Sequence, residues 1–279
     1  MAQHSPKTTD ENSSITRVCP AFTVIKDNPA PFFRLLRQEC DIVCDPYGER
    51  IREIRFAGKS KAEPTEKGLP PTKEYLLWLL DNLDSETIRK ECAAKDKKSS
   101  MERLKLIDEN KGKGQTNLAK KFIKKLDDHK PQNGWFVFEG SSKPDVFIRT
   151  DNFLLVVEGK RTEAGPKIGT VWNPHRHQII RHIENLRHFA QTKYKSLPCY
   201  GIFIVEESKV GQYDLDQYFH DKPYEESLRH LDGNFKGIKD SYKGHLTWQQ
   251  LWEVYRQEKQ PIRYVKRIEY YRDNERPCD

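Results

Sequence analysis

Two carboxylates and a lysine stand close together in the segment that runs from Lys143 to Lys160. Asp145 opens one run of strand-forming residues, and Glu158 and Lys160 end the next run. Carboxylate oxygens are the ligands that Mg²⁺ prefers, and a bound divalent cation activates water as a nucleophile. A lysine beside such a pair can stabilise the negative charge that develops during the reaction. These residue types therefore indicate metal-assisted hydrolysis, as needed to cut a phosphodiester bond.

Two predicted strands bring these residues together. They cover residues 145–150 and 153–158, and Thr150 to Asn152 has the composition of a tight turn between them. If the strands pair about this turn, Asp145 lies near Val156 to Glu158. The two carboxylates are then close enough to share one cation.

The sequence Glu158-Gly159-Lys160 places its two charged side chains on one face of the strand, because residues two apart in a strand project to the same side. Gly159 faces away from them. The absence of a side chain there lets the backbone come close to an ion or a phosphate.

Other elements follow a regular order around this segment. Thr116 is expected to cap a helix, and three strands follow at residues 135–139, 145–150 and 153–158. Asn173 is then expected to cap a second helix that has Pro174 at its first position, and residues 200–205 form a fourth strand. The predicted order is helix, three strands, helix, strand.

Pro144-Asp145, Glu158-Gly159-Lys160 and this order of elements resemble the PD-(D/E)xK nuclease superfamily, over residues 116–205. The resemblance implies an α/β, restriction-endonuclease-like core with a mixed central sheet flanked by helices. It implies that Asp145, Glu158 and the carbonyl of Gly159 bind Mg²⁺ or Mn²⁺. It gives Lys160 the role of orienting the attacking water and stabilising charge in the transition state.

The same family usually supplies a further acidic residue from the helix before the first strand. Here the expected helix has no Glu at a suitable position. Glu109, just upstream, and Glu139, at the end of the first predicted strand, are the two candidates. Each is alternatively a solvated charge at the end of an element.

The helix after the site carries a polar stripe of His175, Gln178, His182 and Asn185. In the resembling family this helix often lends a glutamine to the active centre, so Gln178 is the catalytic candidate. His182, one turn further, is expected to help bind nucleic acid. The alternative is a solvated helix face, and the spacing of the histidines does not allow two of them to bind one zinc ion from a straight helix.

Lysines mark an exposed side of the helix that precedes the strands. Lys120, Lys121 and Lys124 lie there, and they are expected either to follow a phosphate backbone or simply to keep the helix soluble. The net charge of +7 and the pI near 8.9 permit binding to a polyanion but do not require it.

Composition and patterning divide the chain into three parts. Residues 1–16 lack apolar periodicity and are expected to form a flexible tail. Residues 17–70 are expected to form an N-terminal appendage with a hairpin ending in the strand Arg52–Phe56, followed by a linker. Residues 71–279 are expected to form the nuclease-like core, with further helices at its start and a C-terminal extension.

Hydrophobic residues make up only 35% of the chain, charged residues 33%, and no segment reads as a membrane span. The six cysteines lack the paired spacing of a zinc site and are interpreted as reduced thiols. With no signal pattern at its start, the chain is expected to be cytoplasmic.

The function predicted from the sequence is a metal-dependent nuclease, a DNA endonuclease of restriction or defence type. Cutting both strands of a duplex commonly needs two copies of such a site, so a homodimer is a further expectation. One alternative is a catalytically silent module of the same fold that binds nucleic acid or a protein. Another is a structural or interaction protein whose acidic pattern arose by chance.

Overall fold

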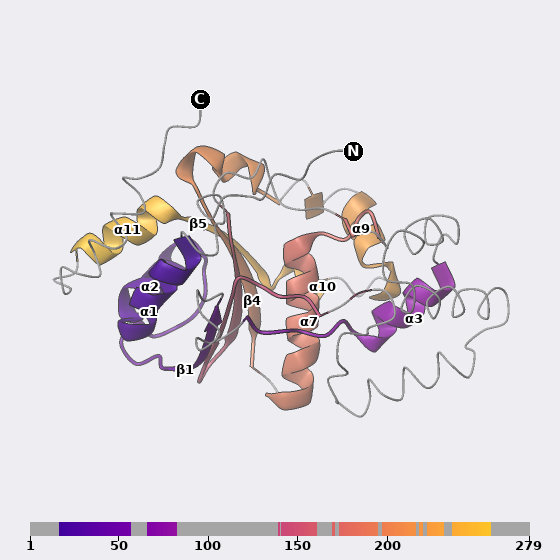
Figure 1. The fold of residues 1–279 in the computed structure, drawn as a ribbon, viewed down its shortest axis with the longest axis horizontal. Helices are drawn as coiled ribbons and strands as arrows, with labels where there is room; N and C mark the ends of the chain where they lie inside the picture. Colours follow the sequence, from indigo (N-terminus) through magenta and orange to yellow (C-terminus); the bar gives the residue numbers. More distant parts are fainter. Residues whose placement is uncertain are drawn as a thin grey trace, which may run out of the picture.

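The computed structural model describes residues 17–56, 66–82, 139, 141–160, 169–170, 173–194, 197–215, 218–219, 222–231 and 236–257. Within them, a five-stranded sheet lies between two layers of helices (Figure 1). The strands neighbour one another in chain order: β1 (Ile51–Phe56), β2 (Val146–Thr150), β3 (Leu154–Gly159), β4 (Cys199–Val205) and β5 (Tyr242–Thr247). The predicted α/β class is confirmed.

The sheet is mixed. β1, β2 and β3 form an antiparallel meander, whereas β4 runs parallel to β3 and β5 runs parallel to β4. α7 (Gln178–Lys193) makes the crossover between β3 and β4. β3 is therefore central, and every residue in it is buried, as expected for a strand covered by helices on both faces.

The turn between β2 and β3 is where the sequence predicted it. The backbone N–H of Thr150 donates to the carbonyl of Phe153 at 2.9 Å, and the Thr150 hydroxyl accepts a hydrogen bond from the N–H of Asn152 at 3.1 Å. Val146 pairs with Val157, which fixes the register of the whole hairpin.

One face of the sheet is covered by α1 (Cys19–Asp27), α2 (Ala30–Glu39) and α11 (Trp248–Gln257) (Figure 1). Their apolar side chains form one hydrophobic core with those of all five strands. Thr247 and Gln250 have the residue types and spacing of a capping box, and they form one at the start of α11: Thr247 N–H donates to Gln250 Oε1 at 2.8 Å and Gln250 N–H donates to Thr247 Oγ1 at 3.0 Å.

α7 covers the other face. Its apolar residues recur at helical spacing and are all buried: Ile179, Ile180, Ile183, Leu186, Phe189 and Ala190. On the side of α7 away from the sheet lie α3 (Lys73–Asn82) and α9 (Lys222–Ser227) (Figure 1). The short helix α10 (Lys236–Lys239) contacts α7 just before β5 begins. The 3₁₀ segments η3 (Glu207–Gln212) and η4 (Arg229–Leu231) contact β5 and α3, respectively.

The strand at residues 51–56 has a different partner from the one expected. It pairs with β2 instead of forming a hairpin within the N-terminal segment. Residues 135–138 of the predicted strand 135–139 lie outside the described residues. Glu139, the described residue of the predicted strand 135–139, belongs to no strand. The physical reason is that Ile54 and Phe56 alternate toward the α1–α2 side, so β1 completes the core that β2 and β3 begin.

The start of α7 also differs from the prediction. Asn173 does not cap the helix; its Oδ1 instead accepts a hydrogen bond from the N–H of His175 at 3.0 Å, which makes a turn. α7 begins five residues later, at Gln178.

Several predicted features lie outside the described residues. These are the tail 1–16, the helix beginning at Thr116 with Lys120, Lys121 and Lys124, the acid Glu109, and the C-terminal extension beyond residue 257. Across the part of the chain that is described, no helix is both long and apolar enough to cross a membrane. The cysteines at positions 19, 40, 44 and 199 are buried, and the thiols of Cys40, Cys44 and Cys199 are free, as interpreted from the sequence.

Candidate active site

Asp145 and Glu158 meet where β2 begins and β3 ends. Val146 pairs with Val157, so Asp145, one residue before Val146, lies beside the end of β3. The backbone N–H of Gly159 donates a hydrogen bond to Asp145 Oδ2 at 2.9 Å. The prediction that these two acidic residues come together is therefore supported by a direct contact between their segments.

The carboxylate of Glu158 is only 3% exposed and is held by three side chains. Its Oε1 accepts hydrogen bonds from Lys160 Nζ at 2.9 Å and from Gln178 Nε2 at 2.5 Å, and its Oε2 lies 3.3 Å from His182 Nε2. Burial alone would raise the pKa of Glu158, but His182 and the Lys160 ammonium lower it to about 2. Glu158 is therefore a buried carboxylate that stays ionised.

The backbone of Lys160 is fixed on both sides. Its N–H donates to the carbonyl of Ile204 in β4 at 2.8 Å, and its carbonyl accepts a hydrogen bond from Trp248 Nε1 in α11 at 2.7 Å. The lysine side chain therefore extends from a rigid strand end toward Glu158.

Gly159 is required by packing as well as by the site. A Cβ placed on it would lie 2.5 Å from Val18 Cγ2 and 3.1 Å from Trp248 Cζ2. These contacts come from the α1–α11 side of the sheet, opposite the face toward which Glu158 and Lys160 point. The glycine between the two charged residues therefore lets the N-terminal segment approach β3 closely.

We expect Gly159→Ala to lower the free energy of unfolding by about 1–3 kcal/mol, because the new methyl group overpacks a filled core. Urea unfolding measures this change. Gly211→Ala is the matched control, since a Cβ at Gly211 meets nothing within 4 Å, and its effect should stay within about 0.5 kcal/mol. Equal effects of the two substitutions would contradict the packing described.

The start of α7 supplies Gln178 to the site, as the resemblance implied. His182 is in a different situation from the one predicted. It is 0% exposed and faces Glu158, so it cannot contact nucleic acid directly. Burial lowers its pKa even though Glu158 acts in the opposite direction, so the ring is neutral near pH 7. The interpretation of the polar stripe as solvated was wrong at Asn185 too, which is fully buried.

His177 is a second buried histidine beside the site, and the sequence analysis did not single it out. It precedes the first residue of α7, and its ring lies 4.8 Å from that of Tyr218. Burial is the main cause that lowers its pKa to about 3, and the nearby Lys160 and His182, the latter once protonated, act in the same direction. Its ring is therefore neutral and lies within electrostatic range of both of these site residues.

The oxygen atoms at this site suit a hard cation. The buried Gln178 Oε1 has no hydrogen-bond donor among the described residues, Glu158 Oε2 has only the His182 ring beside it at 3.3 Å, and Asp145 adds its carboxylate. Oxygen ligands of this kind fit Mg²⁺ or Mn²⁺. The described ranges contain no cluster of three His, Cys, Asp or Glu side chains arranged to hold a metal ion, so protein carboxylates alone do not complete a coordination shell there.

Glu66 is an acidic residue near the site that the sequence did not reveal. Burial and the negative charge of Glu158 raise its pKa, while the Lys143 ammonium lowers it. The segment of Glu66 reaches the site because Leu69 and Ser142 exchange backbone hydrogen bonds of 2.8 Å. That pairing is three residues from Glu66 and three from Asp145. A short bridge between segments more than seventy residues apart has no signal in the sequence.

Glu139, one of the two predicted candidates for a further acid, lies elsewhere. It is buried, and its Oε2 is 3.7 Å from Arg176 Nε. Arg176 is itself 1% exposed and donates to Glu184 Oε2 at 2.5 Å. Glu139 therefore belongs to a separate buried charge cluster between α3 and α7. Its burial also excludes the alternative of a solvated charge.

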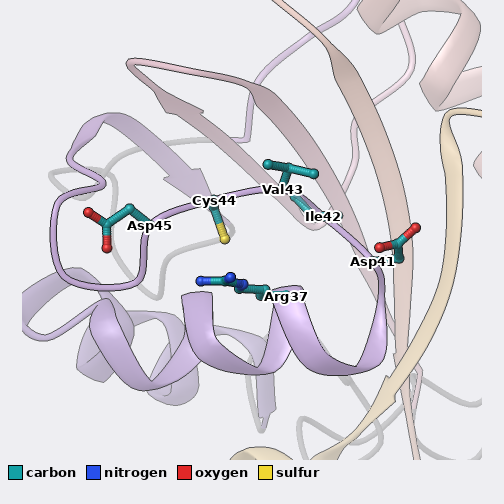
Figure 2. A pocket seen from close by; sticks show the side chains of 6 residues that line it. All are labelled: Arg37, Asp41, Ile42, Val43, Cys44 and Asp45. Atoms are coloured by element: carbon teal, nitrogen blue, oxygen red, sulfur yellow. The ribbon is translucent and has the colours of Figure 1, made fainter.

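A pocket of about 440 Å³ lies at the end of α2, lined by Arg37 and residues 41–45 (Figure 2). The Cys44 thiol and the Arg37 side chain lie between α2 and the loop that follows it, while Asp45 points away (Figure 2). Burial raises the pKa of Cys44 to about 11, so this thiol is not a nucleophile at neutral pH. The residues of the candidate active site do not line this pocket, which among the described residues is lined by Arg37 and residues 41–45 alone.

Comparisons with protein-family models, with curated proteins and with solved structures find no match to this chain.

Proposed function

We propose that this protein is a metal-dependent nuclease that hydrolyses phosphodiester bonds of DNA, as an endonuclease of restriction or defence type. The observation that carries the proposal is the convergence of Asp145, Glu158 and Lys160 at one end of a rigid hairpin. An ionised, buried carboxylate beside a second acid and a lysine is the arrangement that metal-assisted hydrolysis requires. The restriction-endonuclease-like identity of the fold is part of this proposal.

Asp145, Glu158 and the carbonyl of Gly159 would hold Mg²⁺ or Mn²⁺. The chemistry that such an ion supplies is activation of water and neutralisation of phosphate charge. The hydrogen bond from Gly159 N–H to Asp145 keeps the two acidic segments in register, so this pair is arranged before any ion binds.

Lys160 would donate to the phosphate oxygens as negative charge builds up in the transition state. Gln178 donates to the same Glu158 oxygen as Lys160, Oε1, at 2.5 Å, and would orient a water or phosphate through its own Oε1. The pair fixes the Glu158 carboxylate between a strand and a helix. Catalysis would therefore depend on groups whose positions are set by the fold itself.

A catalytically silent module that binds nucleic acid or a protein is the second candidate. Two observations on the possible metal ligands favour it. Glu158 Oε1 already accepts hydrogen bonds from Lys160 and Gln178, and the described residues hold no three-ligand metal group. Binding without cleavage would be the result that this candidate predicts.

Incubation with circular and linear duplex DNA, single-stranded DNA and RNA, each with Mg²⁺, with Mn²⁺ or with EDTA, tests the proposal. We expect circular duplex DNA to be nicked or linearised in the presence of metal and to remain intact in EDTA. Electrophoresis distinguishes these products. The nuclease proposal fails if no substrate is cut with either metal.

A further inference from the structure

Arg181 is a half-buried arginine on α7, one turn beyond Gln178 and next to His182. Its Nε atom is buried and has no hydrogen-bond partner within the described residues. Its charge acts on the neighbouring His182 ring, whose pKa it helps to lower. Arg181 therefore brings a positive charge close to the candidate active site, with no counterion in the part of the chain that the structure describes.

Other arginines in the interior are paired. Arg176 donates to Glu184, and Arg187, two turns further along α7, donates to the carbonyl of Gly237 at 2.8 Å and to Ser241 Oγ at 3.0 Å. Arg17 lies 3.6 Å from Glu206. A partly desolvated guanidinium with no such partner is unfavourable unless a bound anion supplies one.

The surroundings of Arg181 favour an anion over a cation. The first turn of α7 contains no acidic residue, and the side chain of His177, which precedes the helix, does not cap it. The first N–H groups of a sixteen-residue helix thus carry a partial positive charge on the same side of the molecule as Lys160. A planar guanidinium binds two phosphate oxygens at once, which a lysine does not do.

We propose that Arg181 binds non-bridging oxygens of a nucleic-acid phosphate next to the bond to be cut. This inference rests on the proposed function and deepens it by assigning a substrate contact that the sequence did not indicate. The site thereby selects a polyanionic phosphodiester chain, with Arg181 holding the substrate while Asp145, Glu158 and Lys160 act on the neighbouring phosphate.

Binding of a fluorescent duplex oligonucleotide in EDTA, followed by anisotropy across a range of salt concentrations, tests this role without cleavage. We expect Arg181→Gln to raise Kd about 10-fold or more, as for the loss of hydrogen bonds to a charged group, and to reduce the slope of log K against log[salt] by about 0.9. Arg181→Lys should keep the slope and recover only part of the affinity, because it restores the charge without the paired donors.

Lys193→Gln is the matched control, since it removes one positive charge at the opposite end of the same helix. Its Kd should stay within about 2-fold of the wild-type value, and thermal unfolding should show that all variants are folded. Arg181→Gln behaving like Lys193→Gln would overturn the inference, and so would a wild-type protein that does not bind the oligonucleotide. A wild-type protein that binds through Arg181 yet cuts nothing in Mg²⁺ would refute the nuclease proposal and leave this inference standing.

Discussion

Replacing Lys160 with alanine is expected to slow Mg²⁺-dependent cleavage by about 100- to 1,000-fold, the usual effect of removing one group that stabilises transition-state charge. The Lys160 ammonium lies 2.9 Å from Glu158 Oε1 at a strand end that is fixed through its own backbone. The backbone bonds to Ile204 and Trp248 do not involve the lysine side chain, so the variant should keep its fold. Single-turnover cleavage of a plasmid measures the rate.

Lys143→Ala provides the control for the loss of charge. Lys143 is an exposed lysine two residues before Asp145, so its removal changes the local field without touching Glu158. Its cleavage rate should stay within a few-fold of wild type. Asp145→Ala should be as inactive as Lys160→Ala, with near-wild-type circular dichroism. Full activity in Lys160→Ala would exclude the proposed role of the lysine.

The hairpin at the centre of the site could be predicted because its determinants are local. Thr150-Asp-Asn152 specifies the turn, and a buried apolar run follows it, so the position of Asp145 beside Glu158 depends on fewer than twenty consecutive residues. The same holds for the α7 stripe and the Thr247 capping box. Patterns of period two and 3.6 reveal such elements directly.

The partner of β2 could not be predicted, since it comes from a segment ninety residues earlier in the chain. Residues 135–139 and 51–56 both have the composition of a strand, and the packing of Ile54 and Phe56 against α1 and α2 places β1 beside β2. The N-terminal helices were expected to lie in an appendage, but Val18 packs against the Gly159 position itself. Long-range packing of this kind carries no periodic signal.

The polar and charged residues around the site also divide into those that the sequence predicted and those that depend on long-range packing. Glu158 and Lys160 could be identified from residue type and spacing, and Gln178 from the resemblance, whereas the burial of His182 and the places of Glu66 and Arg176 could not. A histidine or arginine in a helical stripe is usually solvated, and only the completed fold shows that His182 and Arg176 are buried. Their burial is possible because each one faces a carboxylate from another element.

The largest effect on the free energy of unfolding is expected in the buried charge cluster around Arg176. Arg176 donates to Glu184 at 2.5 Å, lies 3.7 Å from Glu139 and stacks on Tyr75, with its guanidinium 3.8 Å from the ring centroid. Arg176→Met would leave two buried carboxylates without their cation. We expect it to lower the free energy of unfolding by about 3–5 kcal/mol, a large part of the 5–15 kcal/mol typical of a folded domain. Urea unfolding at pH 7 measures the loss.

The pH dependence of that loss identifies its cause. Burial alone would raise the pKa of Glu184, but Arg176 and His230 lower it to about 2, so in the wild type Glu184 adds stability above pH 4.5 that is lost between about pH 4.5 and 2. Without Arg176, only His230 of these two still counteracts the effect of burial, so the pKa of Glu184 rises. The variant then regains stability as the carboxyl takes up a proton, and its difference from wild type should shrink as the pH falls from 7 toward 4.5.

The double variant Arg176→Met/Glu184→Met separates a lost ion pair from lost packing. Because it removes the stranded carboxylate together with its cation, it should be more stable than Arg176→Met alone at pH 7 and less sensitive to pH. A single variant that costs under about 1 kcal/mol, or whose cost is the same at pH 7 and pH 4.5, would show that the stability of this region does not depend on the buried charges. The contacts among α3, α7 and η4 would then depend on apolar packing instead.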